Sequence, residues 1–236
     1  MENVLPPLTR FKRAALDLLF PRWCLGCGKE GEYICGDCRR SLPFITPPLC
    51  PRCGRPESRG RLCPGCAETE AEIDGIRAPF LFDGVIRRAV HEFKYRNLRA
   101  LAPPLAVLLH QYIRENPLPG EVLVPVPLHP KRYRERGYNQ SALVARELGR
   151  IAGLPVVGDC LIRRGYTPPQ ARTASVGERR VNVAGAFACR DGGLRGKMVI
   201  LIDDVSTSGA TLNACAAALK SAGAGVVWGL VTALEL

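Results

Sequence analysis

The stretch VILIDDVSTSGATL, from Val199 to Leu212, decides the fold class of this 236-residue chain. It opens with a continuous apolar run, which is typical of a strand buried on both faces of a parallel sheet. Two carboxylates, Asp203 and Asp204, end the run, and a turn around Gly209 leads into a helical pattern. The stretch therefore predicts a strand, a tight turn and a helix. Both acids would lie at the carboxyl edge of the sheet, where open α/β folds bind ligands.

The segments on either side extend this unit into a larger α/β domain. Strand patterns occur at 76–84, 121–128, 197–204 and 225–234, and helical patterns at 85–113 (interrupted at Pro103-Pro104), 139–153 and 209–223. Strands that alternate with helices predict a parallel, doubly wound sheet with right-handed crossovers. We therefore expect an α/β domain over residues 76–236.

Cysteine spacing predicts a second, smaller module. The chain has eleven cysteines, and eight form four CxxC pairs: Cys24 and Cys27, Cys35 and Cys38, Cys50 and Cys53, Cys63 and Cys66. This is zinc-ribbon spacing, and four thiolates per ion leave no open coordination position, so two structural Zn2+ sites are expected. Spacing favours ligand sets taken in sequential order, although a crossed pairing stays open. A disulfide framework needs a secretory signal, which the sequence does not show.

We accordingly predict a helix over residues 1–22 and a double zinc ribbon over 23–70. The remaining cysteines, Cys160, Cys189 and Cys215, lie among apolar or small residues and are expected to be buried bystanders.

The charge of the chain indicates an anionic partner. The formal net charge is +11, and each four-thiolate zinc site adds −2, which leaves about +7. Nucleic acids and phosphorylated small molecules are the usual partners of such a basic protein. No apolar run approaches the ~20 residues of a membrane span. The expected location is the cytoplasm, with any peripheral association at the inner face of the membrane made through partners.

The residues around Gly209 favour a phosphate ligand. A helix N-terminus offers unpaired N–H groups and a partial positive charge, which suit a phosphate monoester. Hydroxyl groups of the turn add donors. Asp203 and Asp204 would then accept hydrogen bonds from vicinal sugar hydroxyls, so the expected ligand is a 5-phosphoribosyl group.

A basic turn follows the strand pattern at 121–128 and ends at the same edge. Guanidinium groups bind phosphate oxygens in a bidentate manner, so we expect a pyrophosphate-binding loop with Arg132 and Arg136 as first choices, then Lys131. A solvated basic helix start is the alternative. His129 either hydrogen-bonds there or stabilises the turn, and Asn139 and Gln140 are expected to cap the next helix or brace the loop.

Residues 162–187 are rich in proline, glycine and arginine. This composition is typical of a mobile flap that closes over a ligand and excludes water, and an ordinary surface loop is the alternative. The arginines available to phosphate groups are Arg163, Arg164, Arg172, Arg179 and Arg180.

Two motifs carry a resemblance to known families. VILIDDVSTSGATL resembles the phosphoribosyl-pyrophosphate (PRPP) motif of type I phosphoribosyltransferases. VPVPLHPKRYRERGYNQSALVARELG, residues 124–149, resembles the signature of the ComF family. The order of the CxxC pairs, FKY at 93–95, TPPQ at 167–170 and RRVNVAGAF at 179–187 agrees with that family, and the resemblance covers roughly residues 20–236.

The resemblance implies a type I phosphoribosyltransferase domain joined to a zinc ribbon, and in described members a link to uptake of single-stranded DNA. It implies Mg2+ with PRPP, and Asp203 and Asp204 as catalytic residues. Together with the residues reasoned above, the expected PRPP-binding set is Asp203, Asp204, Ser206, Thr207, Ser208, Gly209, Ala210, Thr211, Lys131, Arg132, Arg136 and Lys94. Only the resemblance promotes Lys94, which is otherwise nearly as well explained as a surface lysine.

Two functions remain open. The favoured one is transfer of a phosphoribosyl group to an unknown acceptor, either a nucleobase, as in salvage, or a nucleic acid. The other is a non-catalytic PRPP sensor or DNA-uptake adaptor whose zinc ribbon docks a DNA translocase or helicase. The basic loops allow contact with single-stranded DNA but lack the interleaved aromatic residues of a stacking platform.

Overall fold

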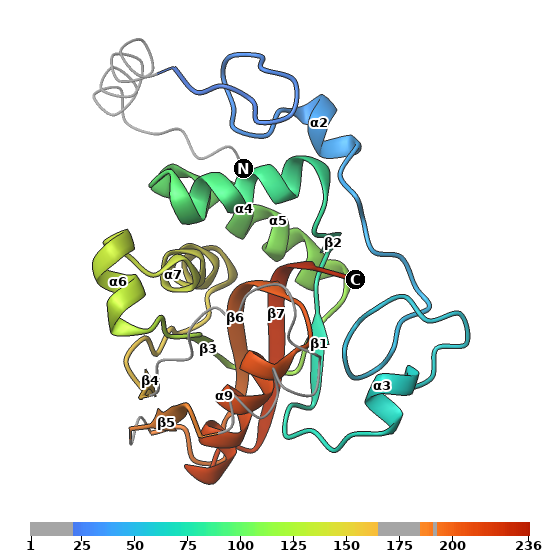
Figure 1. The fold of residues 1–236 in the computed structure, drawn as a ribbon, viewed down its shortest axis with the longest axis vertical. Helices are drawn as coiled ribbons and strands as arrows, with labels where there is room; N and C mark the ends of the chain where they lie inside the picture. Colours follow the sequence, from blue (N-terminus) through green and yellow to red (C-terminus); the bar gives the residue numbers. More distant parts are fainter. Residues whose placement is uncertain (1–20, 165–184, 191–192) are drawn as a thin grey trace. The chain divides into compact units, whose positions relative to one another are not determined.

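The computed structural model describes residues 21–164, 185–190 and 193–236 (Figure 1). The chain divides into two compact units, one ending at Leu42 and the other spanning Pro43–Leu236. The helix predicted over 1–22 lies almost entirely outside the described residues. So does most of the predicted flap, including Arg172, Arg179 and Arg180.

The first unit is a small knuckle built around cysteines. The N–H of Cys24 donates to the carbonyl of Lys29 at 2.8 Å, and Trp23 pairs with Glu30 in an antiparallel bridge. A short helix, α2 (Gly36–Arg40), begins directly after Cys35 and contains Cys38, the other member of the second CxxC pair. In the described part of this unit, residues 21–42, a metal ion held by the cysteines would stabilise the fold, because so short a segment can bury only a small apolar core.

The second unit contains the predicted parallel sheet. Its strands are β1 (Gly75–Arg77), β2 (Phe80–Leu81), β3 (Val122–Pro125), β6 (Met198–Ser206) and β7 (Val226–Leu234). They lie in the order β1-β7-β6-β3, with β2 also beside β7, and all these pairs are parallel. The predicted α/β class with a parallel sheet is confirmed.

Helices cover both faces of this sheet (Figure 1). The helices of this unit are α3 (Pro64–Ala67), which belongs to the second cysteine knuckle, and α4 (Gly84–Tyr95), the 3-10 turn η1 (Arg99–Leu101), α5 (Ala102–Glu115), α6 (Pro130–Arg136), α7 (Gln140–Ala152) and α9 (Ala210–Ser221). Helix α7 packs on α5, β3 and β6, whereas α9 packs on β6, β7 and the antiparallel pair β4 (Leu161–Arg163) and β5 (Phe187–Cys189). None of the helices in the described part of the chain has the length and apolar character needed to cross a bilayer.

The break in the helical pattern at 85–113 lies earlier than predicted. Helix α4 ends at Tyr95, and Pro103 and Pro104 belong to the first turn of α5. Proline is tolerated there because the first N–H groups of a helix have no intrahelical partner. The two prolines therefore start a helix instead of interrupting one.

The alternation of side chains along β6 separates two apolar layers. Val199 and Leu201 pack with Cys215 and Leu219 of α9 in one core cluster. Ile200 is 2% exposed and points to the opposite face, because successive strand residues alternate. This alternation continues through the two acids at the end of the strand and directs their side chains to different neighbours.

Candidate functional site

The two carboxylates at the end of β6 are held by different helices. Asp204 pairs with Lys94 of α4 at 2.7 Å, with side chains 13% and 23% exposed. Asp203 accepts a hydrogen bond from Ser141 Oγ of α7 at 2.9 Å and another from the N–H of Asp204 at 2.9 Å. Lys94, which only the family resemblance had suggested, thus contacts one of the predicted site residues.

The surroundings of Asp203 disfavour its charged form. Burial raises the pKa of Asp203, the neighbouring carboxylate of Asp204 raises it further, and Lys94 and the hydrogen bonds lower it, for a result of about 7. A ligand that donates hydroxyl hydrogen bonds to this carboxylate would stabilise its ionised form. The site is therefore suited to vicinal hydroxyl groups.

The turn after β6 leads directly into α9, as predicted. We call Ser206–Thr211 the hydroxyl loop. Gly209 has a φ of +75°, a left-handed conformation that glycine adopts without strain. The Oγ of Ser208 accepts from the N–H of Ala210 at 3.4 Å, whereas Ser206 is only 5% exposed. The first N–H groups of α9 are thus presented beside hydroxyl side chains.

The basic segment after β3 forms a helix, not the predicted loop. Helix α6 begins at Pro130 and ends before Gly137, whose φ is +76°. His129 caps it, because its Nδ1 accepts from the N–H of Lys131 at 3.1 Å. Burial lowers the pKa of His129, and the nearby cations, Arg163 foremost, lower it further. The proline at the first position and the glycine after the last were the signals for this helix.

Asn139 caps α7, as the sequence predicts. Its side-chain oxygen accepts from the N–H of Ser141 at 3.0 Å, and its amide donates to the carbonyl of Val126 at 2.9 Å. The cap therefore also braces the segment that follows β3. This fixes the position of Ser141, a site residue that the sequence analysis did not single out.

Arg163 lies at the start of the predicted flap, close enough to Arg132 of α6 and to Asp203 of β6 to interact with both electrostatically. Burial lowers the pKa of Arg163, Arg132 lowers it further, and Asp203 has the opposite effect. Its guanidinium lies 5.3 Å from the ring centre of Phe187. Its Nε has no hydrogen-bond partner among the described residues. Arg164 is exposed, and its N–H donates to the carbonyl of Ala186 at 2.8 Å.

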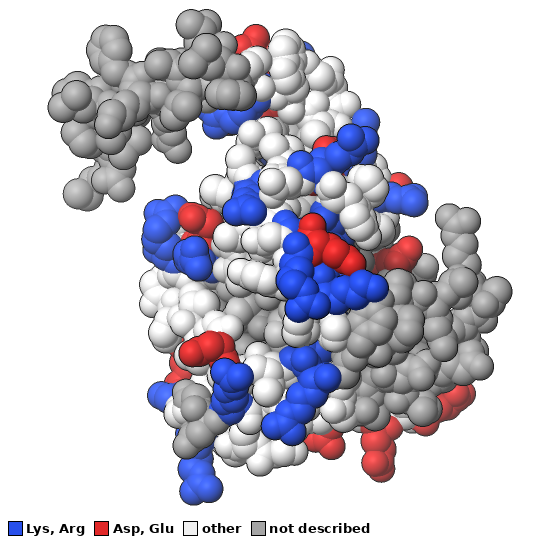
Figure 2. All heavy atoms as spheres, turned by 60° about the vertical axis from the view of Figure 1, so that its left-hand side comes forward, with Lys and Arg blue, Asp and Glu red and all other residues white. Residues whose placement is uncertain are grey.

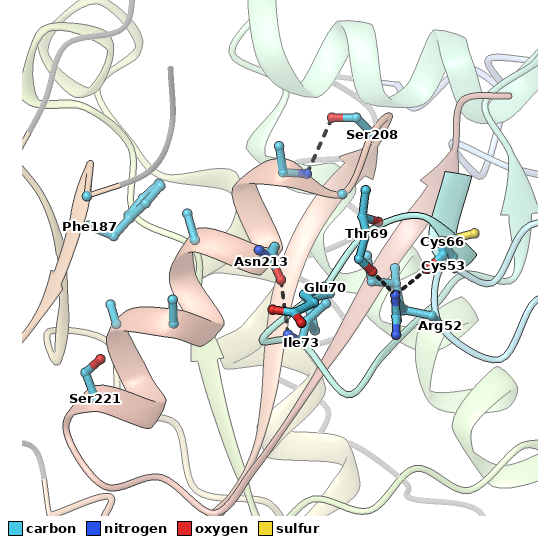
Figure 3. A pocket seen from close by; sticks show the side chains of 18 residues that line it. Arg52, Cys53, Cys66, Thr69, Glu70, Ile73, Phe187, Ser208, Asn213 and Ser221 are labelled. Atoms are coloured by element: carbon cyan, nitrogen blue, oxygen red, sulfur yellow. Dashed lines mark hydrogen bonds between the residues drawn. The ribbon is translucent and has the colours of Figure 1, made fainter. Parts of the chain in front are cut away.

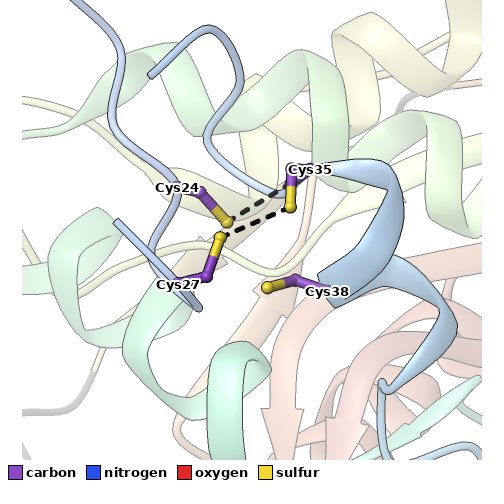
Figure 4. A group of neighbouring side chains, drawn as sticks. All are labelled: Cys24, Cys27, Cys35 and Cys38. Carbon is purple, nitrogen blue, oxygen red and sulfur yellow. Dashed lines mark hydrogen bonds between the residues drawn. The ribbon is translucent and has the colours of Figure 1, made fainter. Parts of the chain in front are cut away.

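The predicted metal ligands form two groups of four, in sequential order. The sulfur atoms of each group lie within 4.8 Å of one another, and Figure 4 shows the first group. The members are Cys24, Cys27, Cys35 and Cys38 in one group and Cys50, Cys53, Cys63 and Cys66 in the other. Each set matches a structural zinc site, since thiolates in groups of four are the usual ligands of structural Zn2+.

One thiol in each group is prepared for ionisation. Burial raises the pKa of Cys24, but hydrogen bonds from the N–H groups of Cys35, Cys27 and Gly26 outweigh it and bring the pKa to about 6. The same balance brings the pKa of Cys50 to about 6. Thiolates are the form that binds zinc.

Of the other cysteines, Cys160 and Cys215 are buried and Cys189 is half-buried.

The second group of four belongs to the same unit as the sheet. The N–H of Ile76 on β1 donates to the carbonyl of Arg52 at 2.7 Å, and the guanidinium of Arg77 donates to the carbonyl of Pro51 at 2.9 Å. A cavity of about 590 Å3 lies between this knuckle and α9 (Figure 3). Asn213 of α9 accepts from the N–H of Glu72 at 2.7 Å beside it. The domain boundaries predicted from sequence remain a prediction.

The chain is similar to one family model and to parts of several solved structures. The double zinc ribbon domain family matches residues 15–67. Solved structures that resemble part of the chain include a *Bacillus subtilis* glutamine PRPP amidotransferase complexed with ADP and GMP. It has a TM-score of 0.39 and 21% identity over 56% of this chain and 26% of that one. A purine phosphoribosyltransferase from *Pyrococcus horikoshii* has a TM-score of 0.35 and 19% identity, covering 60% of this chain and 75% of that one.

Curated relatives match most of the sequence. The competence protein ComFC of *Bacillus subtilis* is 30% identical over 202 residues, which cover 83% of this chain and 81% of the relative. Competence protein F of *Haemophilus influenzae* is 30% identical over 85% of this chain and 90% of its own length. The DNA utilization protein YhgH of Escherichia coli K12 is 27% identical over 82% of this chain and 87% of its own length. With two groups of four cysteines before a parallel α/β domain, the chain belongs to the ComF family of competence proteins.

Proposed function

We propose that the chain binds PRPP at the carboxyl edge of its sheet and transfers the 5-phosphoribosyl group to an acceptor. The observation that carries the proposal is the convergence of three features at this edge. The hydroxyl loop suits the 5-phosphate, Asp203 and Asp204 suit the ribose hydroxyls, and the cations of α6 with Arg163 suit the pyrophosphate. The resemblance of Val199–Leu212 to the PRPP motif supports the same reading.

The proposed reaction exchanges one bond at C1 of the ribose. The bond from C1 to the pyrophosphate oxygen breaks, and that oxygen keeps the electron pair. A nucleophile forms the new bond to C1, and pyrophosphate leaves. Positive charge develops on the sugar ring, so carboxylates below it and guanidinium groups near the leaving group would both lower the barrier.

The residues of the site fit a role for Mg2+ bound together with PRPP. The cation would neutralise charge on the pyrophosphate. Asp203 and Asp204 are oxygen ligands of the kind that Mg2+ accepts, and they would meet it through water, since Mg2+ usually keeps several waters. Lys94 already neutralises Asp204 at 2.7 Å, so the carboxylate pair does not carry its full charge before the ligand arrives.

The names of the relatives connect the proposal with DNA. Two are competence proteins and one is a DNA utilization protein. We extend the proposal to a role in natural competence, with incoming single-stranded DNA or one of its components as the acceptor. A nucleobase acceptor and a non-catalytic PRPP-sensing adaptor, with the zinc ribbon docking a translocase, are the competing versions.

Calorimetry with PRPP and Mg2+ tests the binding step. The variants are Asp203→Asn and Asp204→Asn, with Asp74→Asn as a control, because Asp74 pairs with Lys220 away from the loop. Binding that falls in the two site variants and persists in the control supports the proposal. A pyrophosphate-release assay over nucleobases and single-stranded oligonucleotides then separates the enzyme from the sensor. Absence of PRPP binding by the wild-type protein would refute both.

A specific surface favours single-stranded DNA as a second ligand. Tyr95 and Tyr133 are 67% and 52% exposed, and the guanidinium of Arg136 lies 5.6 Å from the ring centre of Tyr95. Folding thus places next to the basic helix an aromatic side chain that the local sequence pattern does not reveal. Basic side chains are also prominent on the face shown in Figure 2. Bases stack on exposed aromatic rings, and each stack contributes about 1–3 kcal/mol.

Fluorescence titration with oligothymidylate tests this surface. Tyr95→Ala should weaken binding by about tenfold, whereas Tyr112→Ala, at a residue on α5, serves as the aromatic control. Binding that strengthens at low salt indicates phosphate contacts. Equal affinity of the wild type and Tyr95→Ala would remove the stacking role.

A further inference from the structure

A side chain from the second cysteine group reaches the hydroxyl loop. The Nη2 of Arg55 donates to the carbonyl oxygen of Thr207 at 2.6 Å and to that of Glu235 at 3.1 Å. The N–H of Glu235 in turn donates to the carbonyl of Ser206 at 2.9 Å. Two consecutive carbonyl groups at the start of the loop are therefore fixed, one by Arg55 itself and one by a residue that Arg55 also holds.

The position of Arg55 depends on the knuckle that carries it. The carbonyl of Arg55 accepts from the N–H of Cys50 at 2.8 Å, which closes the turn around this CxxC pair. The sulfur of Cys50 accepts from the N–H of Cys63 at 3.4 Å, which joins the two halves of the ligand set. A metal ion bound by these thiolates would hold the same turn, because a tetrahedral site fixes all four ligands at once.

The knuckle is seated closely on β1, so the tether has a firm base. A Cβ on Gly54 would lie 2.4 Å from the carbonyl oxygen of Ile76, which only glycine permits. Apart from the contact made by Arg55, open space lies between the knuckle and the hydroxyl loop. A cavity of about 560 Å3 is lined by Arg55, Thr207 and Gly209 among others, and the cavity of Figure 3 adjoins Ser208. The loop therefore has room to move if the hydrogen bonds from Arg55 are lost.

We propose that Arg55 is a positioning residue for the hydroxyl loop, and that metal loading of the second cysteine group thereby sets the affinity of the loop for a phosphate ligand. The statement about affinity rests on the proposed binding of PRPP. Fixing a carbonyl group also fixes the N–H of the same peptide unit, so the donors of the loop are aligned before the ligand arrives. A preorganised loop loses less conformational entropy on binding.

Hydrogen exchange of the ligand-free, zinc-loaded full chain tests the tether without PRPP. In Arg55→Met the amides of residues 206–211 should exchange faster than in the wild type, because local opening costs less free energy. Arg55→Lys, which keeps the charge and one donor, should be intermediate. The matched control is Arg61→Met, at an exposed arginine of the same knuckle. Equal exchange in Arg55→Met and the wild type overturns the tether.

Calorimetry with Mg2+ and PRPP tests its consequence for affinity. Loss of a hydrogen bond to a charged group should weaken binding by about tenfold or more in Arg55→Met, and Arg61→Met should match the wild type. Cys53→Ser removes a ligand of the second group and Cys27→Ser one of the first, with zinc content measured for each. Of the two cysteine variants, only Cys53→Ser should weaken PRPP binding. Combined with Arg55→Met, it should weaken PRPP binding little beyond the effect of Arg55→Met alone.

The possible failures can be told apart. Equal PRPP affinity in Arg55→Met and the wild type, or equal weakening by Cys27→Ser and Cys53→Ser, overturns the coupling. If the wild type binds no PRPP, the proposed function fails, while hydrogen exchange still decides whether Arg55 orders the loop. The Arg55 variants leave both cysteine groups intact, so they decide the tether even if a cysteine variant does not fold.

Discussion

The ion pair between Lys94 and Asp204 gives the sharpest test of the site geometry. The two charges are 2.7 Å apart, with side chains only 23% and 13% exposed. Lys94→Met keeps most of the side-chain volume but leaves the Asp204 carboxylate without its partner. Removing one member of a fully buried pair costs about 3–5 kcal/mol. Because this pair retains some exposure, we expect a loss of about 2–3 kcal/mol in the free energy of unfolding.

A double variant distinguishes the loss of the Lys94–Asp204 attraction from the cost of leaving the Asp204 carboxylate unpaired. Asp204→Asn in the Lys94→Met background removes the unpaired carboxylate, so most of the stability should return and the double variant should lie within about 1 kcal/mol of the wild type. The control is Lys197→Met, since Lys197 pairs with Glu121 at 3.0 Å but both side chains are about half exposed. That variant should lose less than about 1 kcal/mol.

Urea unfolding of the zinc-loaded protein, followed by tryptophan fluorescence, measures these differences. Trp228 lies on β7, within the sheet, and reports on the second unit. The geometry is refuted if Lys94→Met lowers the free energy of unfolding no more than Lys197→Met does. It is also refuted if adding Asp204→Asn to Lys94→Met restores none of the lost stability, because Lys94 then does not compensate a desolvated carboxylate.

Three further predictions concern stability. Because the pKa of Asp203 is raised to about 7, the native state binds more protons than the unfolded state between the two pKa values, and stability falls as pH rises through that range. Asp203→Asn should therefore stabilise the protein and raise its melting temperature above neutral pH, and it should bring no gain in acid. Thermal melts across pH test this, and a gain independent of pH contradicts it. Gly209→Ala should cost about 1–2 kcal/mol because of the φ of +75°, which urea unfolding measures; no loss would show that the loop adopts another conformation. Gly54→Ala should cost more than Gly60→Ala in the same assay, since both have positive φ but only Gly54 faces a backbone oxygen at 2.4 Å; equal losses would show that the knuckle is not closely seated on β1.

The sequence predicts those parts of the site that depend on local patterns. The strand, turn and helix around Gly209 follow from the apolar run and the residues of the turn. The cysteine groups follow from spacing alone, and the structure agrees with the sequential order that spacing favoured over a crossed one. For Pro130–Arg136 the favoured interpretation was a phosphate-binding loop and a basic helix start was the alternative; the structure has the helix, for which the start and stop residues are standard signals.

Contacts between segments that are distant in the chain could not be predicted from the sequence. Nothing in the local pattern around Ser141 indicates that its hydroxyl meets Asp203, which is 62 residues away. Arg55 gave no signal either, since an arginine after a CxxC pair looks like an ordinary surface residue. Both contacts depend on how the elements pack, and packing is a property of the whole fold.

The two cysteine groups, which lie in different units of the chain, should exchange their metal at different rates. Both groups have covered members, but the first contains an exposed thiol, Cys27, whereas in the second Cys53 and Cys63 are half-buried and Cys50 and Cys66 are buried. A chelator reaches an open thiolate directly but must wait for an opening motion to reach a covered one. Zinc release should therefore be biphasic, and only the slow phase should follow the unfolding rate of the sheet. In a cell short of zinc, the first cysteine group would lose its ion early and the second group would keep its ion longer.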